Sequence, residues 1–120
     1  VELMELNHDL PVECAVFYAL MTFTMGVRLD IQTVPFCIES YNPAVREMLV
    51  KLGQQMSKTV YLVSSDERRT LHVGAVFACN FTNHLIGLSK HILDKESLDF
   101  ELLKPIIRET IRKALGVEHP

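Results

Sequence analysis

The sequence predicts a mixed α/β protein in which a sheet part, residues 1–64, precedes an all-helical part, residues 65–120. Two observations support this division. Three short apolar runs rich in β-branched and aromatic residues are confined to the first part. In the second part, apolar residues recur at helical spacing along two long stretches. The 120-residue chain is 48% hydrophobic and 22% charged, the balance of a globular protein.

The three apolar runs predict three strands, Cys14–Leu20, Val34–Glu39 and Thr59–Ser64. We expect the first two to be buried, because they are nearly continuous in apolar residues. Pro35 should begin its strand or place it at an edge, since proline cannot donate to a ladder. The residues up to Leu10 alternate poorly, so their pattern assigns no element to this segment.

A helix is predicted between the second and third strands. Asn42 is a suitable N-cap, and Pro43 suits the first helical position. Gly53 interrupts the pattern, so the helix should end near Ser57. Its apolar stripe consists of Val45, Met48, Leu49 and Leu52.

A long helix should follow the third strand. Ser64 and Glu67 have the spacing of a capping box, and the apolar pattern continues to about Leu93. The polar residues His72, Cys79 and Asn83 fall within roughly 40° of one direction at ~100° per residue.

The last helix is predicted to start near Ser97 or Leu98 and to end at Gly116, a natural C-terminal cap. Pro105 lies inside this stretch. Because proline removes a backbone donor, it should kink the helix or restart it.

Charge and cysteine content exclude some classes of function. The net charge of −3 disfavours nucleic-acid binding, which needs a basic excess. No apolar run reaches the ~18 residues of a membrane span, so we expect no membrane partner. Cys14, Cys37 and Cys79 form no CxxC pair, which predicts three reduced thiols packed inside a cytoplasmic protein. The chain begins with Val1, and we expect a piece of a longer polypeptide rather than a processed whole protein.

Four segments resemble one family of Rossmann-like NADP-dependent oxidoreductases, which join a nucleotide-binding domain to a helical C-terminal domain of unassigned function. The segments are AVFYALMTF (15–23), VPFCIES (34–40), VYLVSSDERRTLHVGAVFACNFTNHL (60–85) and LDFELLKPIIRETIRKAL (98–115). That family is similar in layout to pyrroline-5-carboxylate reductase, 6-phosphogluconate dehydrogenase and the deazaflavin-dependent NADP oxidoreductases. The resemblance implies that residues 1–64 are the last strands and one helix of a Rossmann-like domain. It also implies that residues 65–120 are a helical domain like the C-terminal domain of 6-phosphogluconate dehydrogenase.

The chain departs from the family pattern in two places. Ala19 and Met21 stand where the family usually has proline and glutamine in its first matching strand. The Gly-rich G-x-G-x-x-G turn, which cradles a dinucleotide pyrophosphate, is absent from these 120 residues. The resemblance therefore implies that NADP binds to the longer parent protein, and we expect none to be bound by this chain alone.

The resemblance also suggests site residues. In such dehydrogenases the first long helix of the helical domain faces the nicotinamide, which implies a catalytic role for His72 as general acid. Asn83 and Asn80 would then hold a carbonyl or carboxylate of a small substrate. The alternative is structural: His72 would cap a buried hydrogen-bond network, and Asn83 would bond across a subunit interface.

Other polar groups suggest a metal site, a nucleophile or an anion contact. Asn80, His84 and His91 share a helix face, but the two histidines lie ~10 Å apart along the axis, so we predict no metal site. Cys79 could be a nucleophile, although a buried packing thiol is the simpler interpretation. The arginines at 68 and 69 could reach a phosphate or carboxylate, or pair with the acids Asp66 and Glu67 beside them.

Small residues line another side of the long helix, which allows a second helix to approach closely. They are Gly74, Ala75, Ala78 and Thr82. We predict a homodimer through this helix, the last helix or both; packing against the last helix of the same chain is the alternative. The function predicted overall is dimerisation and one wall of a cleft in which a small carbonyl or imine receives a hydride. The alternative is a non-enzymatic dimerisation or interaction module of a nucleotide- or metabolite-sensing protein.

Overall fold

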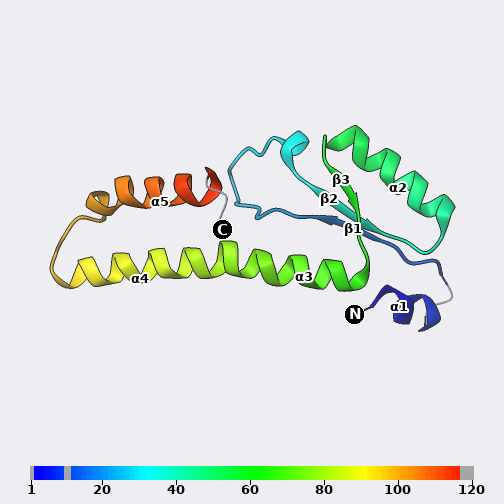
Figure 1. Ribbon diagram of the computed structural model, residues 1–120, viewed down its shortest axis with the longest axis horizontal. Coiled ribbons are helices and arrows are strands. Elements are labelled where there is room, and N and C mark those ends of the chain that lie inside the picture. Colours follow the sequence, from blue (N-terminus) through cyan, green and yellow to red (C-terminus); the bar gives the residue numbers. More distant parts are fainter. Residues whose placement is uncertain (1, 10–11, 117–120) are drawn as a thin grey trace. The chain divides into compact units, whose positions relative to one another are not determined.

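The computed structural model describes residues 2–9 and 12–116 (Figure 1). Two compact units, residues 1–73 and 74–120, make up the chain. The first unit holds the sheet, and its elements are α1 (Leu3–Asp9), β1 (Val16–Ala19), η1 (Ile31–Thr33), β2 (Phe36–Glu39), α2 (Pro43–Met56), β3 (Val60–Leu62) and the start of α3 (Ser65–Ala75). The rest is helical, with η2 (Val76–Phe81), α4 (Thr82–Lys95), η3 (Phe100–Leu103) and α5 (Lys104–Gly116). The mixed α/β class is therefore confirmed.

The three strands form one sheet in the order β1–β2–β3. β1 pairs antiparallel with β2, and β2 pairs parallel with β3 through the crossover helix α2. All four residues of β2 are buried, as predicted. The four residues of β1 are only half-buried, so the expectation of a buried first strand is wrong; within the described chain, β1 has a neighbouring strand on one side only. Pro35 directly precedes Phe36, the first residue of β2, and so lies at the start of the strand, one of its two predicted places.

The strand register separates the side chains of the two faces of the sheet. Phe17 lies opposite Ile38, and Phe36 lies opposite Val60, on the face that α2 covers. A Cβ atom on Gly53 of α2 would lie 3.1 Å from a Val60 methyl group, so Gly53 allows close packing here. The other face carries the alternate residues, and α1 and α3 lie on that side (Figure 1).

Local sequence signals account for α2. The Asn42 side chain accepts hydrogen bonds from the backbone N–H groups of Ala44 and Val45, and Pro43 is the first helical residue, both as predicted. The helix ends at Met56, one residue before the predicted end.

The N-terminal helix α1 was not predicted. Leu3 is fully buried, and its backbone N–H donates to the Ser65 hydroxyl at 3.2 Å. Seven residues with an irregular apolar pattern carry little helical signal of their own. Contacts with a residue 62 positions away hold this segment, and a local pattern cannot show such contacts.

The predicted long helix is confirmed, because every residue from Ser65 to Lys95 is helical. Its capping box is also present: the Ser64 N–H donates to Glu67 Oε2 at 2.7 Å, and the Glu67 N–H donates to Ser64 Oγ at 3.2 Å. Residues 76–81, however, form a π-helix, whose bonds run from i to i+5. An angle of 100° per residue therefore does not hold between His72 and Asn83.

The predicted start of the last helix is wrong. Ser97 has a φ of 54°, a left-handed conformation that ends α4 rather than beginning a new helix. Asp99 then caps the short η3 helix by accepting from the Glu101 N–H at 2.9 Å. α5 begins at Lys104, so Pro105 lies in its first turn and restarts the helix, one of the two predicted outcomes.

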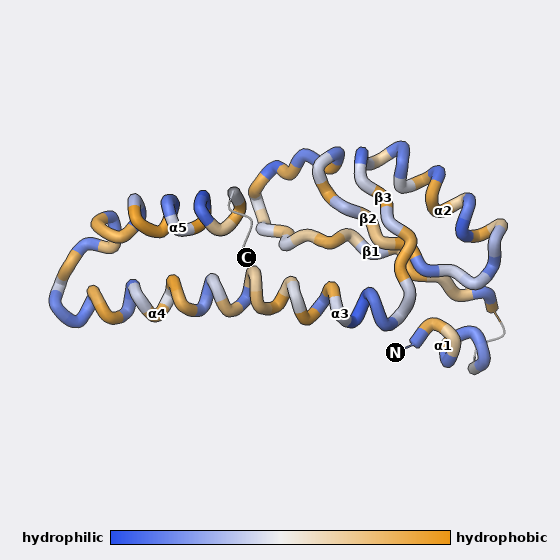
Figure 2. The backbone as a smooth tube through the Cα atoms, viewed as in Figure 1, coloured by the Kyte–Doolittle hydropathy of each residue, from blue (hydrophilic) through white to orange (hydrophobic). Residues whose placement is uncertain are grey.

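None of the described residues of η2, α4, η3 and α5 is buried. Apolar residues nevertheless recur along these helices (Figure 2). All three cysteines are free thiols; Cys37 is buried, Cys14 is half-buried and Cys79 is exposed. The prediction of a buried thiol at Cys79 is therefore wrong, because no other part of the described chain covers it.

Candidate functional site

A pocket of about 260 Å³ lies beside α3 on the sheet face opposite α2. Its lining residues are Val16, Tyr18, Ser65, Arg68, Arg69 and His72. All six belong to the first compact unit. Two of these side chains are guanidinium groups, and no carboxylate is among them.

Regular geometry brings these residues together. Val16 and Tyr18 are two positions apart on β1, so both point to the same face of the sheet. Residues 65, 68, 69 and 72 have the spacing i, i+3, i+4 and i+7, which places them on one face of α3. The pocket is therefore formed between one strand and one helix face.

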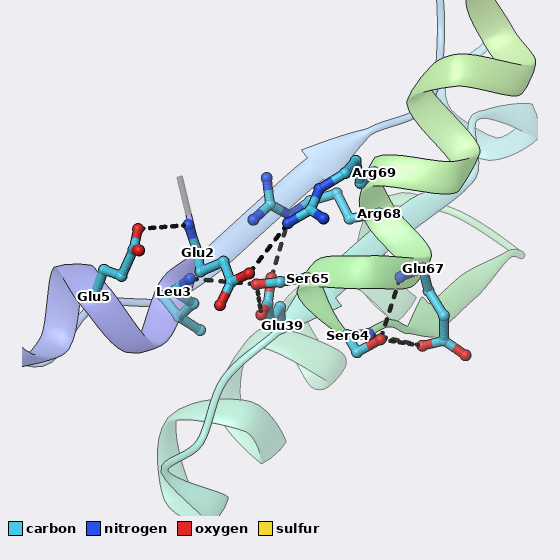
Figure 3. Close-up of polar contacts among 9 residues, drawn as sticks. All are labelled: Glu2, Leu3, Glu5, Glu39, Ser64, Ser65, Glu67, Arg68 and Arg69. Carbon is cyan, nitrogen blue, oxygen red and sulfur yellow. Dashed lines mark hydrogen bonds and ion pairs between the residues drawn. The ribbon is translucent and has the colours of Figure 1, made fainter.

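A buried carboxylate anchors the start of α3 next to the pocket. Glu39, the last residue of β2, is 5% exposed. One of its oxygens accepts from the Ser65 hydroxyl at 2.5 Å, and the other accepts from Arg68 Nε–H at 3.1 Å (Figure 3). Because both carboxylate oxygens are engaged, Glu39 fixes the direction in which Arg68 approaches the pocket.

Arg69 makes a different, more exposed set of contacts. Its Nη2 donates to Glu2 Oε1 at 3.1 Å, and its Nη1 lies 3.4 Å from Asp66 Oδ1. The sequence offered pairing with the neighbouring acids as one alternative, and the Arg69–Asp66 pair agrees with it. Glu67 instead caps α3, and hydrogen bonds from the Ser64 backbone and side chain lower the pKa of its carboxyl group.

The structure separates the predicted site residues into two groups. His72 is exposed and lines the pocket. Asn80 in η2 and Asn83 in α4 are also exposed, but they belong to the second compact unit and do not line this pocket. Their substrate-binding role therefore stays a prediction.

Sequence reasoning missed three contributors to this region. Tyr18 is a polar aromatic residue in an otherwise apolar strand, Glu39 is a lone acid at the end of an apolar run, and Ser65 begins the stripe that His72 ends. The i, i+3, i+4, i+7 spacing of residues 65–72 was the available signal. The contact of Glu39 with α3 joins residues 26 and 29 positions apart, so it required the fold.

A second pocket of about 570 Å³ lies along β3 and the start of α3. Mostly apolar residues line it, and the buried Cys37 thiol is among them. Burial raises the pKa of this thiol from its ordinary value of 9.0. The thiol therefore stays protonated near neutral pH, and the smaller polar pocket is the better candidate for chemistry.

Within residues 2–9 and 12–116, no three His, Cys, Asp or Glu side chains are arranged to hold a metal ion. No helix there combines the length and the apolar character needed to cross a membrane.

Comparison with known proteins gives the family. Residues 34–119 match the model of a domain of unknown function, DUF2520. The chain belongs to this family. No curated protein matches the chain.

A crystal structure of a putative NADP oxidoreductase, BF3122 from Bacteroides fragilis, is similar to this member of the DUF2520 family. The two are 38% identical and superpose with a TM-score of 0.80 over 87% of the present chain. The present chain spans 40% of the length of that protein. The matched DUF2520 region contains Glu39 and the α3 residues of the pocket, whereas Tyr18 precedes it.

Proposed function

We propose that this DUF2520 chain is the C-terminal part of an NADP-dependent oxidoreductase that reduces a small carbonyl or imine substrate. The chain would supply one wall of the substrate cleft and a helical dimerisation domain of the kind found in 6-phosphogluconate dehydrogenase. The observation that carries this proposal is His72 in a pocket with two arginines. The similarity to the Bacteroides fragilis protein supports it. The three free cysteines support a cytoplasmic location for the parent protein.

The described strand-to-helix connections do not fit the pyrophosphate of NADP. The N-terminus of α2 is capped by the Asn42 side chain, and that of α3 by Ser64 and the Glu67 carboxylate. Backbone N–H groups at a helix start hold a pyrophosphate only when they face the ligand, and a carboxylate at that place repels it. We therefore assign cofactor binding to another part of the parent protein.

In this proposal His72 acts as the general acid. The nicotinamide held by the parent would supply the hydride, and the His72 imidazole would donate a proton to the substrate oxygen or nitrogen that gains charge. The i+7 spacing places His72 on the same face of α3 as Ser65, so its ring lines the same pocket as the two arginines.

Asn80 and Asn83 are proposed to bind the substrate carbonyl or carboxylate in the parent protein. Asn80 lies in the π-helical segment η2, and such segments often occur at functional sites. Asn80→Ala and Asn83→Ala should each raise KM for the substrate by about 10-fold, the value of one hydrogen bond to a charged group. Unchanged KM values in both variants would remove these residues from the site.

A homodimer through the long helices is proposed because none of the described residues of η2, α4, η3 and α5 is buried. Large apolar residues are exposed at regular intervals along η2 and α4, namely Phe77, Phe81, Leu85, Leu88 and Ile92. A partner surface would remove them from water. Leu85→Glu should convert the dimer to a monomer in light scattering, whereas Lys90→Glu, a charge change on the same helix, should not.

The decisive experiment is His72→Ala in the full-length protein, assayed with NADPH and a panel of keto acids and imines. We expect kcat/KM to fall by about 10² to 10⁴, while the melting temperature changes little because His72 is exposed. His84→Ala is the control, since His84 is also exposed but lies outside the pocket. If His72→Ala unfolds the protein and leaves activity per folded molecule intact, the residue is structural.

One observation favours a second function, a non-enzymatic dimerisation module in a sensing protein. Ala19 and Met21 replace the proline and glutamine usual in the family's first matching strand, which removes a polar side chain near the end of β1. In that case NADPH would bind to the full-length protein without being consumed by any substrate of the panel.

A further inference from the structure

We propose that the pocket beside His72 binds an anionic group of the ligand, a carboxylate or a phosphate, through Arg69, and that Glu2 competes internally for this arginine. This inference rests on the proposed function, because it names the substrate class of the same site. It is carried by the charges that line the pocket and by the Glu2 carboxylate, which already pairs with Arg69.

The lining of the pocket favours an anion. Arg68 and Arg69 bring two positive charges, and the described lining residues include no acid. Tyr18 and His72 add a hydroxyl and an imidazole, both of which can donate a hydrogen bond to an oxyanion. A cationic ligand would find no carboxylate among these lining groups.

The two arginines differ in how easily they can change partner. The Arg68–Glu39 pair is largely withdrawn from water, with side chains 26% and 5% exposed. If a ligand replaced Glu39 as the partner of Arg68, the buried Glu39 carboxylate would be left without a positive partner. The Arg69–Glu2 pair is open, with side chains 63% and 50% exposed. Exposed pairs contribute little, so Arg69 is the arginine that can exchange Glu2 for a ligand.

Glu2 shows the geometry that a ligand would use. Its carboxylate accepts from Arg69 Nη2 at 3.1 Å, close to the Glu39 and Ser65 pair that anchors α3 (Figure 3). Glu2 directly precedes α1, and the backbone N–H of the next residue, Leu3, donates to the Ser65 hydroxyl. Arg69, which lines the pocket and which we assign to the ligand, therefore already holds a carboxylate.

Anion binding can be measured without any turnover. In the full-length protein labelled at the histidine ring carbons, the His72 resonance is assigned by its loss in His72→Gln. Sodium acetate and inorganic phosphate are then titrated separately at constant ionic strength, and the shift of this resonance gives the Kd for each probe. The stronger of the two probes identifies the carboxylate or phosphate class.

The variants should move the Kd in opposite directions. Arg69→Met should weaken binding of the preferred anion about 10-fold, the loss of one charge-assisted contact. Glu2→Gln should strengthen it about two- to fivefold, because the competing surface pair is removed. A merely structural ion pair would make both variants neutral or both worse. Arg69→Lys should retain part of the affinity if the methionine variant folds poorly.

The matched controls are Arg112→Met and Glu109→Gln, which disrupt an arginine–glutamate pair of similar exposure on α5. They should leave the Kd unchanged. Equal shifts in these controls, or a Glu2→Gln variant that binds no tighter, would overturn the anion site. If the Kd values respond to Arg69→Met and Glu2→Gln as expected but the full-length protein turns over no substrate of the panel, the anion site stands and only the proposed reaction fails.

Discussion

The Glu39 carboxylate is expected to be the main polar contact that fixes the start of α3 on the sheet. The perturbation is Glu39→Ala. This change removes the acceptor of the Ser65 hydroxyl and of Arg68 Nε–H, and it leaves a small void at a position that is 5% exposed. Both losses should destabilise the folded protein.

The expected magnitude follows from these contacts. A hydrogen bond to a charged group contributes about 1.5–3 kcal/mol. Arg68 is 26% exposed and recovers part of this from water, so about 2 kcal/mol is assigned to the two contacts together. The lost Cγ methylene adds about 0.8 kcal/mol, and the free energy of unfolding should fall by about 3 kcal/mol in total. Glu39→Gln keeps the shape and should cost about half as much.

The assay is urea unfolding of the full-length protein followed by circular dichroism. Glu101→Ala, which breaks the exposed pair with Lys104, should change the free energy of unfolding by less than about 0.5 kcal/mol. The double variant Glu39→Leu with Arg68→Met should be less destabilised than Glu39→Ala, because the apolar pair leaves no partly buried arginine without its carboxylate. A loss below about 1 kcal/mol in Glu39→Ala, or a double variant that is at least as destabilised as Glu39→Ala, would refute the reasoning.

Three smaller predictions concern packing, thiol chemistry and helix capping. Gly53→Val should cost about 1–3 kcal/mol by overpacking, because even a Cβ would lie 3.1 Å from a β3 side chain; an unchanged melting temperature would contradict the close approach. Cys37 should react with a thiol reagent far more slowly than the exposed Cys79. Its raised pKa adds stability below the unfolded-state value of 9.0, and that stability is lost as the pH rises through the folded-state pKa, so Cys37→Ser should abolish this alkaline slope. Ser64→Ala should cost about 1 kcal/mol, measured by urea unfolding. The lowered pKa of Glu67 adds stability that is lost as the pH falls from 4.5 through the folded-state pKa, a dependence that Glu67→Gln should remove.

Much of the fold could be predicted because its signals are local. Asn42 begins α2 because its side chain accepts hydrogen bonds from backbone N–H groups of the first turn, and Pro43 suits that turn because it has no N–H that needs a partner. The Ser64–Glu67 capping box begins α3 by contacts that are equally local. The three strands were found from composition alone. The π-helical turn at 76–81 and the short η3 helix were not predicted. Each differs from an α-helix by only a small free energy, so the surrounding residues decide which type of helix forms.

The candidate site was only half accessible from the sequence. His72 and the arginines beside it belong to one helix, so their spacing could be interpreted directly. Tyr18 joins them from β1, and only the antiparallel register with β2 decides which face of the sheet it shares.

The sequence by itself determined the α/β class, the caps and the helical stripe that ends at His72, because backbone donors and apolar periods act over a few residues. The tertiary structure alone decided that Glu39 is buried beneath α3, that Leu3 is held by Ser65 and that Glu2 reaches Arg69. Each of these contacts closes a loop of 26 to 67 residues, and loop closure depends on the whole fold rather than on neighbours in the chain.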